Sequence, residues 1–177
     1  FLQDYDLIYS HSSFKVLRHK LFAPAKERVW DQLAAETGMI QFTMGNSPNP
    51  QPGTCLVPTD LRYRPGGYGW DTVSPRQVFD GGVQDSEDAA FVIDLPNGKY
   101  HLYFQFQSDM VRPHYISFYA NGKHLGAPVT VPITQATVEK IEQVKISNNR
   151  LTLVIHSLDK GLNAYWIWRG CTIKKVS

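Results

Sequence analysis

The segment 108–114 gathers three different polar functional groups within a short stretch of chain. Asp109 supplies a carboxylate, Arg112 a guanidinium and His114 an imidazole. A guanidinium binds a carboxylate or a pair of hydroxyls through two parallel hydrogen bonds, so these residues suit a sugar or a uronic acid. A solvated loop with one internal salt bridge explains the same residues equally well. The arginines that would extend a cationic rim at this end are Arg62, Arg64 and Arg76.

The run Tyr68-Gly69-Trp70-Asp71 is a second group of ligand candidates. Exposed aromatic rings stack on the apolar faces of sugar rings, and a neighbouring carboxylate accepts hydrogen bonds from paired hydroxyls. The competing interpretation is that Trp70 fills one end of a hydrophobic core, with the glycine allowing close packing. The sequence leaves both interpretations open.

The loop before the C-terminal tryptophans supplies a third group. Asn163 and Tyr165 are its ligand candidates, because they precede a predicted strand and carry groups that bind sugars. Trp166 and Trp168 alternate with Ile167, which places both indoles on one face of that strand. This spacing favours a stripe of core residues over an exposed aromatic platform.

Metal binding and catalysis find less support in the sequence. Ca²⁺ prefers several oxygen ligands, and a structural calcium is the cofactor that one acidic stretch would hold. The chain has no Gly-x-Ser-x-Gly elbow, HExxH motif, P-loop or dinucleotide-binding fingerprint, so we do not expect an enzyme. A lyase or esterase stays open as a third interpretation, with a set that the fold would have to assemble from His101, His114, Ser117 and Asp109. The acidic stretch that would hold the calcium contains Asp80, Asp85, Glu87 and Asp88.

Composition limits the partners of the chain. Its 177 residues carry a formal net charge of only +2, spread along the sequence, which argues against nucleic-acid binding. No apolar run approaches the roughly 20 residues that a membrane span needs. Because the chain begins with Phe1, we interpret it as a fragment or a mature product. Cys55 and Cys171 are interpreted as buried thiols, with a disulfide of an exported protein as the alternative.

The run 91–119 organises the predicted fold. Aromatic and apolar residues recur with a period of two over 100–106, which favours a strand. Pro96-Asn97-Gly98 predicts a tight turn, because proline fixes its own φ and Asn-Gly tolerates positive φ. With strands over 91–95 and 114–119, the run is expected to form an antiparallel meander with one buried face.

Turn residues and short apolar runs continue along the rest of the chain. Strands are predicted over 39–45 and 150–156, and the ambiguous stretch 137–146 is interpreted as a strand. Asn121-Gly122 predicts a hairpin, and Gly170 a bulge in the last strand. We therefore expect an all-β protein, a β-sandwich of the jelly-roll type over 39–177. Residues 1–38 are expected to form a linker or cap with one helix that begins after Pro24 and ends before Gly38.

The order of several motifs resembles that of the galactose-binding-domain-like jelly-roll modules of polysaccharide-degrading enzymes. The resemblance covers roughly residues 39–176 and is nearest to the N-terminal modules of rhamnogalacturonan acetylesterase-like proteins and related lyases. Such modules usually have an Asp before Phe-Gly, whereas this strand reads Phe42-Thr43-Met44-Gly45. The motifs that carry the resemblance are 40–45, 68–71, 94–100, 119–123, 149–153 and 165–170.

The resemblance implies a carbohydrate-binding module that is not itself catalytic. It would target an attached polysaccharide-degrading catalytic domain to a polysaccharide or oligosaccharide, and the arginine-rich loops suggest an acidic, pectin-like glycan. The expected location is extracellular or periplasmic, and the composition argues against a nucleic-acid or membrane partner. The alternative is a structural spacer domain of a larger glycoside hydrolase, lyase or esterase, with no ligand of its own.

Overall fold

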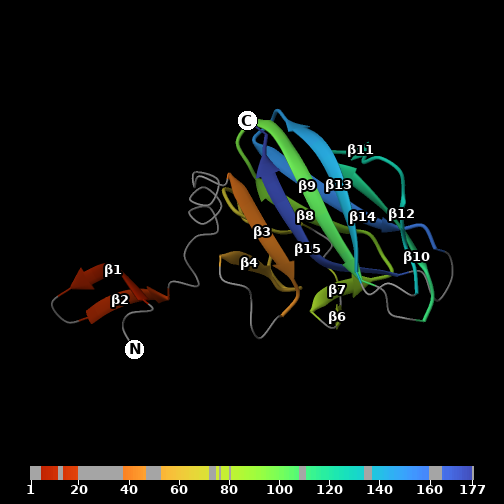
Figure 1. Ribbon diagram of the computed structural model, residues 1–177. Helices are drawn as coiled ribbons and strands as arrows, with labels where there is room; N and C mark the ends of the chain where they lie inside the picture. Colours follow the sequence, from red (N-terminus) through yellow and green to blue (C-terminus); the bar gives the residue numbers. More distant parts are fainter. Residues whose placement is uncertain are drawn as a thin grey trace.

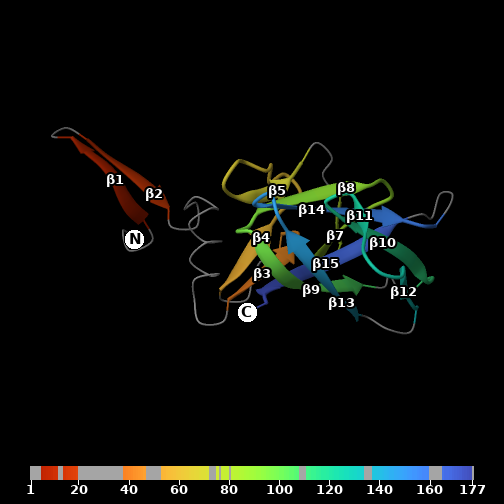
Figure 2. The same ribbon diagram turned by 90° about the horizontal axis from the view of Figure 1, so that it is seen from above.

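In the computed structural model, the described strands from β3 onward pack as two sheets face to face (Figure 1). The two layers are seen edge-on in Figure 2, with β8 and β14 in one layer and β3, β9 and β13 in the other. Within the described ranges, no helix has the length and hydrophobicity needed to cross a lipid bilayer. The structure describes residues 5–11, 14–19, 38–46, 53–71, 75, 77–79, 81–107, 111–133, 137–159 and 165–176.

One layer, called here the β9 sheet, has the strand order β13-β9-β15-β3-β4. Its β3–β4 pair is parallel, and the other pairings in this sheet are antiparallel. β7 pairs with β15, and β6 pairs with β7. The strands of this sheet are β3 (Met39–Met44), β4 (Thr54–Val57), β6 (Gln77–Phe79), β7 (Gly82–Asp85), β9 (Gly98–Gln107), β13 (Thr137–Ile146) and β15 (Trp166–Lys175).

The other layer, called the β10 sheet, has the order β11-β10-β14-β8-β5, with β12 also paired to β10. A separate antiparallel pair, β1 and β2, shares no pairing with either sheet among the described residues. The strands of the β10 sheet are β5 (Tyr68–Trp70), β8 (Ala89–Asp94), β10 (His114–Ala120), β11 (Lys123–His124), β12 (Val129–Val131) and β14 (Arg150–Ser157), and the separate pair is β1 (Tyr5–His11) and β2 (Phe14–His19).

The predicted meander over 91–119 is wrong, because β8, β9 and β10 alternate between the two sheets. The turn after β8 does not close a hairpin on itself. The Asn97 N–H donates to the Asn149 side-chain oxygen at 3.2 Å, and the Asn149 N–H donates to Asn97 Oδ1 at 2.8 Å. These bonds tie the turn to the distant β13–β14 connection, so the chain passes from one layer to the other.

Other local predictions are confirmed. The Asn121-Gly122 turn joins β10 to β11, and both residues have positive φ, 49° and 77°. The pairing of β15 with β9 shifts register between Trp168 and Gly170, which is the predicted bulge. The stretch 137–146 is a strand that pairs with β9 along its whole length. The helix predicted between Pro24 and Gly38 lies outside the described residues.

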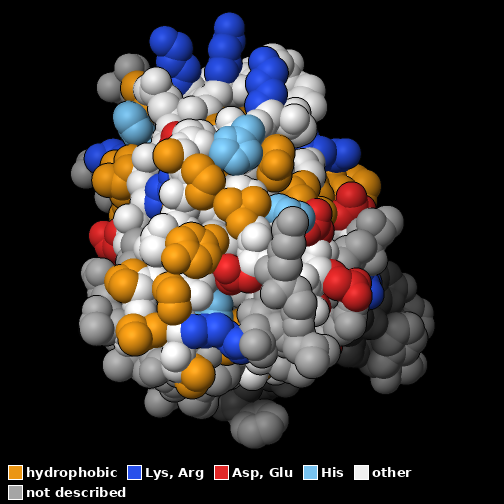
Figure 3. Space-filling view, turned by 90° about the vertical axis from the view of Figure 1, so that its right-hand side faces the viewer, with side chains coloured by type: hydrophobic (Ala, Val, Ile, Leu, Met, Phe, Trp, Pro, Cys, Tyr) orange, Lys and Arg blue, Asp and Glu red, His pale blue; other side chains and the backbone are white. Residues whose placement is uncertain are grey.

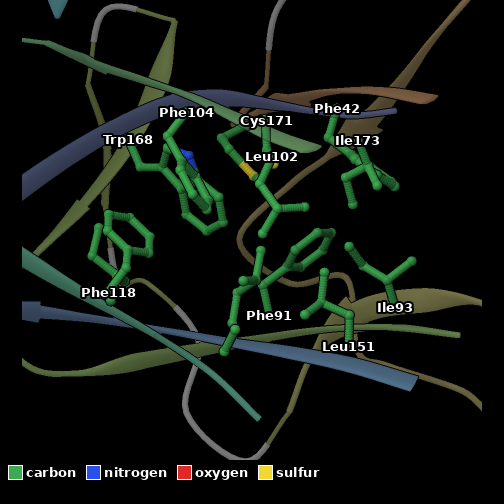
Figure 4. Packing of buried hydrophobic residues seen from close by; sticks show 14 of the residues in the cluster. Phe42, Phe91, Ile93, Leu102, Phe104, Phe118, Leu151, Trp168, Cys171 and Ile173 are labelled. Atoms are coloured by element: carbon green, nitrogen blue, oxygen red, sulfur yellow. The ribbon is translucent and has the colours of Figure 1, made fainter. Parts of the chain in front are cut away.

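The core lies between the sheets and is rich in aromatic rings (Figure 4). Alternate residues of β9 point inward, and Tyr100, Leu102, Phe104 and Phe106 are each 0% exposed. The Phe91 ring packs edge-on against Trp168, with 5.9 Å between ring centroids. Burial of each such side chain stabilises the fold by roughly 1.5–3 kcal/mol relative to its exposed state. The residues that alternate with period two in the sequence are therefore the ones that stabilise the core.

The two cysteines are buried thiols that do not form a disulfide. Phe42 pairs in register with Cys171 on one side and with Cys55 on the other, so a complete strand separates the cysteines. Two strand spacings are about 9–10 Å, which exceeds the Cα separation of a disulfide. Burial raises the pKa of the Cys171 thiol far above its ordinary value, so this thiol stays protonated and unreactive.

Candidate functional site

Three of the predicted ligand residues meet at one end of the sandwich. Arg112 precedes β10, His114 begins β10, and Tyr165 precedes β15 in the opposite sheet. The Arg112 guanidinium lies 5.0 Å from the centroid of the Tyr165 ring. The His114 ring is buried, and its centroid is 4.5 Å from that of Tyr165. Tyr165 therefore connects the two layers and orients the guanidinium by a cation–π contact.

Asp159, which the sequence analysis did not select, belongs to the same cluster. It follows β14, and its Oδ2 atom accepts a hydrogen bond from the Tyr115 N–H at 3.3 Å. The same oxygen lies 3.7 Å from His114 Nδ1, and the carboxylate side chain keeps 18% of its surface exposed. A carboxylate fixed in this way at the surface can accept hydrogen bonds from the hydroxyls of a ligand. Its position just after the strand predicted over 150–156 was the signal that would have identified it.

Tyr115 is the exposed aromatic residue of this end, and the sequence analysis did not select it. Its side chain is 44% exposed, because in β10 the residues next to the buried His114 and Ile116 point outward. Leu158 lies beside it, since the Leu158 N–H donates to the Tyr115 carbonyl at 2.8 Å. The exposed hydrophobic residues at this end are Tyr115 with Val111, Ile133 and Leu158. Strand alternation places Tyr115 on the outer face of β10, and the structure shows that its side chain is exposed there.

Tyr68 and Trp70 are core residues, so their predicted role as a stacking platform is wrong. Tyr68 is 5% and Trp70 0% exposed. The Trp70 ring contacts Phe91 and Trp168, at centroid distances of 5.3 and 6.0 Å, and its Nε1–H donates to the Pro58 carbonyl at 2.9 Å. The indole is thus fully used by the fold, and the competing interpretation of a core tryptophan is the correct one. Trp166 and Trp168 are also 0% exposed, as their spacing predicted.

Gly69 explains why the motif around Trp70 contains a glycine. The segment 61–63 crosses directly over it, with Trp70 N–H donating to the Leu61 carbonyl at 2.8 Å and Tyr63 N–H to the Trp70 carbonyl at 2.9 Å. A Cβ atom at position 69 would lie 2.6 Å from the Tyr63 nitrogen. Only glycine permits this approach of two backbone segments.

The remaining predicted site residues do not join the cluster in the described part of the chain. Asp71 is exposed after β5, but β8 and β14 separate β5 from β10. Arg62, expected on the cationic rim, donates from Nη1 to the Asp71 carbonyl at 3.0 Å. Three of the predicted ligand residues lie outside the described residues, namely Arg76, Asp109 and Asn163.

Two carboxylates of the acidic stretch expected to bind calcium interact with other groups of the protein. Asp85 Oδ1 accepts hydrogen bonds from the N–H groups of Ser86 and Glu87, at 2.7 and 3.1 Å. Asp88 Oδ1 lies 2.5 Å from His156 Nδ1. Among the described residues, no three His, Cys, Asp or Glu side chains are grouped so that they could hold a metal ion. Asp80 lies outside those residues.

A polar network at the other end of β14 is structural. Arg150 Nε donates to Asp94 Oδ1 at 2.9 Å, and the Tyr63 hydroxyl donates to Asp94 Oδ2 at 2.8 Å. The Arg150 guanidinium also covers the Tyr63 ring at 4.9 Å and donates to its hydroxyl. Burial and then the neighbouring Asp94 raise the pKa of Tyr63 to about 12. The groups satisfy one another, so this network fastens the 61–67 segment to the sheet.

Comparisons with known proteins identify the fold. No family model matches the chain, and no curated protein matches it. The protein YXIM of Bacillus subtilis has a similar structure, with 22% identity and a TM-score of 0.59, covering 78% of this chain and 40% of that one. This chain has the same β-sandwich fold.

Two further solved structures share this fold. A calcium-binding mutant of Bacteroides uniformis β-glucuronidase 2 is 12% identical, with a TM-score of 0.61, over 96% of this chain and 22% of that one. The plant receptor-like kinase FER is 10% identical, with a TM-score of 0.56, over 78% and 42%. The chain spans less than half the length of each of the three proteins.

Proposed function

We propose that this chain is a non-catalytic carbohydrate-binding module whose site lies at the ends of β10, β14 and β15. The observation that carries the proposal is the exposed ring of Tyr115 at the same end of β10 as the Arg112–Tyr165 stack and the Asp159 carboxylate. A sugar presents an apolar ring face and a rim of hydroxyls, and this surface offers a partner for each.

The contacts that hold the site would make binding efficient. The Arg112 guanidinium is already placed over Tyr165, and the Asp159 carboxylate is already bonded to the β10 backbone. Groups that are fixed before binding lose less conformational entropy when the ligand arrives. A planar guanidinium also recognises a carboxylate through two hydrogen bonds, which supports an acidic, pectin-like glycan as the ligand.

The fold supports a role beside a catalytic domain. The same sandwich occurs as a part of a β-glucuronidase, of whose chain it covers only 22%. A module of this kind raises the local concentration of an attached polysaccharide-degrading enzyme at its glycan. A secreted location, outside the cell or in the periplasm, and a structural calcium that aids the fold belong to the same proposal.

A glycan array probed with the whole chain tests the proposal. The array would carry pectic polysaccharides, other acidic glycans and neutral plant glycans. We expect a saturable signal on at least one glycan, and a loss of most of that signal for Tyr115→Ala. If no glycan on the array binds the native chain, the proposal is wrong.

A spacer domain without a ligand is the second candidate function. The burial of Tyr68 and Trp70 supports it, because these rings were expected to form an exposed platform. A spacer would show no glycan binding, and removing it would change the thermal stability of the attached catalytic domain rather than its adsorption to a polysaccharide. The array and an adsorption assay on the longer protein therefore separate the two functions.

A further inference from the structure

The outer face of the β10 sheet continues the apolar surface of the candidate site. Ile116 and Phe118 of β10 point into the core and are 0% exposed, so Tyr115 and Tyr119 point outward, whereas Ser117 between them is only 2% exposed. Figure 3 shows the side of the molecule on which β10, β11 and β12 lie. Hydrophobic side chains form a band on this side, and histidines lie among them.

Strand pairing places a second aromatic residue at the far end of this band. Tyr119 is half-buried and lies opposite Val154 of β14, and its ring is 5.1 Å from the exposed His124 of β11. Tyr119 lies four residue steps along the extended strand from Tyr115, which is about 13 Å. The two tyrosines thus face the same side at a separation longer than one sugar ring.

Hydrogen-bonding groups lie between the two tyrosines. Ser117 pairs in register with His156 of β14. His156 Nδ1 lies 2.5 Å from Asp88 Oδ1, and the two side chains are 41% and 58% exposed. This pair offers one exposed imidazole and one exposed carboxylate halfway along the band, where ligand hydroxyls would need partners.

We infer that the ligand is an extended oligosaccharide chain that runs from the candidate site along the outer face of β10, past the His156–Asp88 pair, to Tyr119. This inference rests on the proposed function and specifies its ligand as a chain of several sugars rather than a terminal sugar. Aromatic rings at both ends with polar groups between them match the alternating apolar faces and hydroxyl rims of such a chain. We place the oligosaccharide on this face rather than on the outer face of the β9 sheet, because this face is continuous with the candidate site.

Chain-length dependence of binding tests the inference. Galacturonan oligomers and xylan oligomers serve as acidic and neutral probes, each as a disaccharide, tetrasaccharide and hexasaccharide, with affinity measured by isothermal titration calorimetry. We expect the native chain to bind the hexasaccharide of the preferred series about tenfold more tightly than the disaccharide. Tyr119→Ala should remove that advantage while leaving the disaccharide affinity within about twofold.

Two control variants distinguish failure of this inference from failure of the proposed function. Tyr103→Ala changes a half-buried tyrosine on the outer face of the opposite sheet and should leave the length dependence intact. Tyr119→Phe keeps the ring and should behave as the native chain, which separates loss of stacking from loss of folding. If both series bind without length dependence, or if Tyr119→Ala does not change it, the inference is wrong and the proposed function stands. If neither the oligomers nor the array glycans bind, both are wrong.

A protein partner on the same face is a further outcome. Light scattering on the native chain and on Tyr119→Ala would detect a dimer that depends on this tyrosine. Such a dimer, without length-dependent glycan binding, would assign the face to a second copy of the chain and overturn the inference.

Discussion

At the scale of single residues, ionisation of the Tyr63 hydroxyl is linked to the stability of the fold. Burial first, and then the hydrogen bond and charge of Asp94, raise its pKa from 10.0 to about 12. Because the folded pKa is the higher one, the stabilisation is complete below pH 10 and is lost as the pH rises towards 12. We expect a spectrophotometric titration to show one tyrosine ionising near pH 12, absent in Tyr63→Phe. With Asp94→Asn, the same tyrosine should ionise at a lower pH, and an unchanged titration would contradict the network.

Protonation of Asp94 links the stability of the fold to pH in the acid range. Its burial would raise its pKa, but the hydrogen bonds from Arg150, Gly66 and Tyr63 together hold the pKa below 3.8. A depressed folded pKa stabilises the protein above pH 3.8, and this stabilisation is lost as the pH falls through the folded pKa. The unfolding free energy of Asp94→Asn should therefore fall less steeply with acid than that of the native chain, as measured by urea titrations across this range.

Gly69 is the residue at which backbone contact leaves no room for a side chain. The Cβ atom of Gly69→Ala would meet the backbone of the 61–63 segment, so that segment or β5 must move. We expect a loss of roughly 2 kcal/mol or more in the free energy of unfolding. Gly122→Ala is the matched control, because Gly122 also has positive φ but has no atom within 4 Å of the added Cβ. Equal losses in the two variants would show that conformational strain, rather than the crossing segment, requires the glycine.

At the scale of elements, the connection between β8 and β9 depends on Asn149. This residue adopts φ of 56° and accepts the Asn97 N–H through its side chain. Asn149→Gly keeps the conformation available but removes that acceptor, and it should lower the free energy of unfolding by about 1 kcal/mol. The neighbouring Asn148→Gly is the control. A change for Asn148→Gly equal to that for Asn149→Gly would indicate that the backbone, and not the side-chain bond, determines the effect.

Local patterns predicted which segments are strands, but not which sheet each strand joins. The alternation over 100–106 reports burial directly, and all the inward residues that it indicated are buried. Pro96-Asn97-Gly98 also forms the predicted turn. Its partner, Asn149, is distant in sequence, and β9 pairs with β13 and β15 rather than with β8. Long-range pairing of this kind leaves no trace in a short window of sequence, so the meander was the wrong arrangement.

The sequence predicted some of the residues of the candidate site, but not which aromatic residues are exposed. The loops before β10 and β15 were expected to supply ligand residues, and Arg112, His114 and Tyr165 do meet. Local sequence does not distinguish a tyrosine that the opposite layer covers from one that faces water. Tyr68 and Tyr115 are of the same type, yet the first is 5% and the second 44% exposed. That difference depends on the opposing sheet and therefore required the structure.

At the scale of the whole molecule, the central claim is that the loop end of this sandwich binds a sugar. The loop end combines an exposed ring, an oriented guanidinium and a fixed carboxylate, whereas the rings of Trp70, Trp166 and Trp168 are buried in the core. Binding should therefore depend on Tyr115 and Arg112 and be independent of the outer face of the β9 sheet, where Tyr103 lies. Truncation of either residue should leave the core closed, because Tyr115 is exposed and Arg112 is half-buried at the end of the sandwich.

Calorimetric titration of the best glycan from the array into the native chain, Tyr115→Ala, Arg112→Ala and Tyr103→Ala tests this claim most directly. We expect the first two variants to weaken binding roughly tenfold or more, with unchanged thermal stability, and Tyr103→Ala to bind as the native chain does. Equal affinity for the native chain, Tyr115→Ala and Arg112→Ala would contradict the claim.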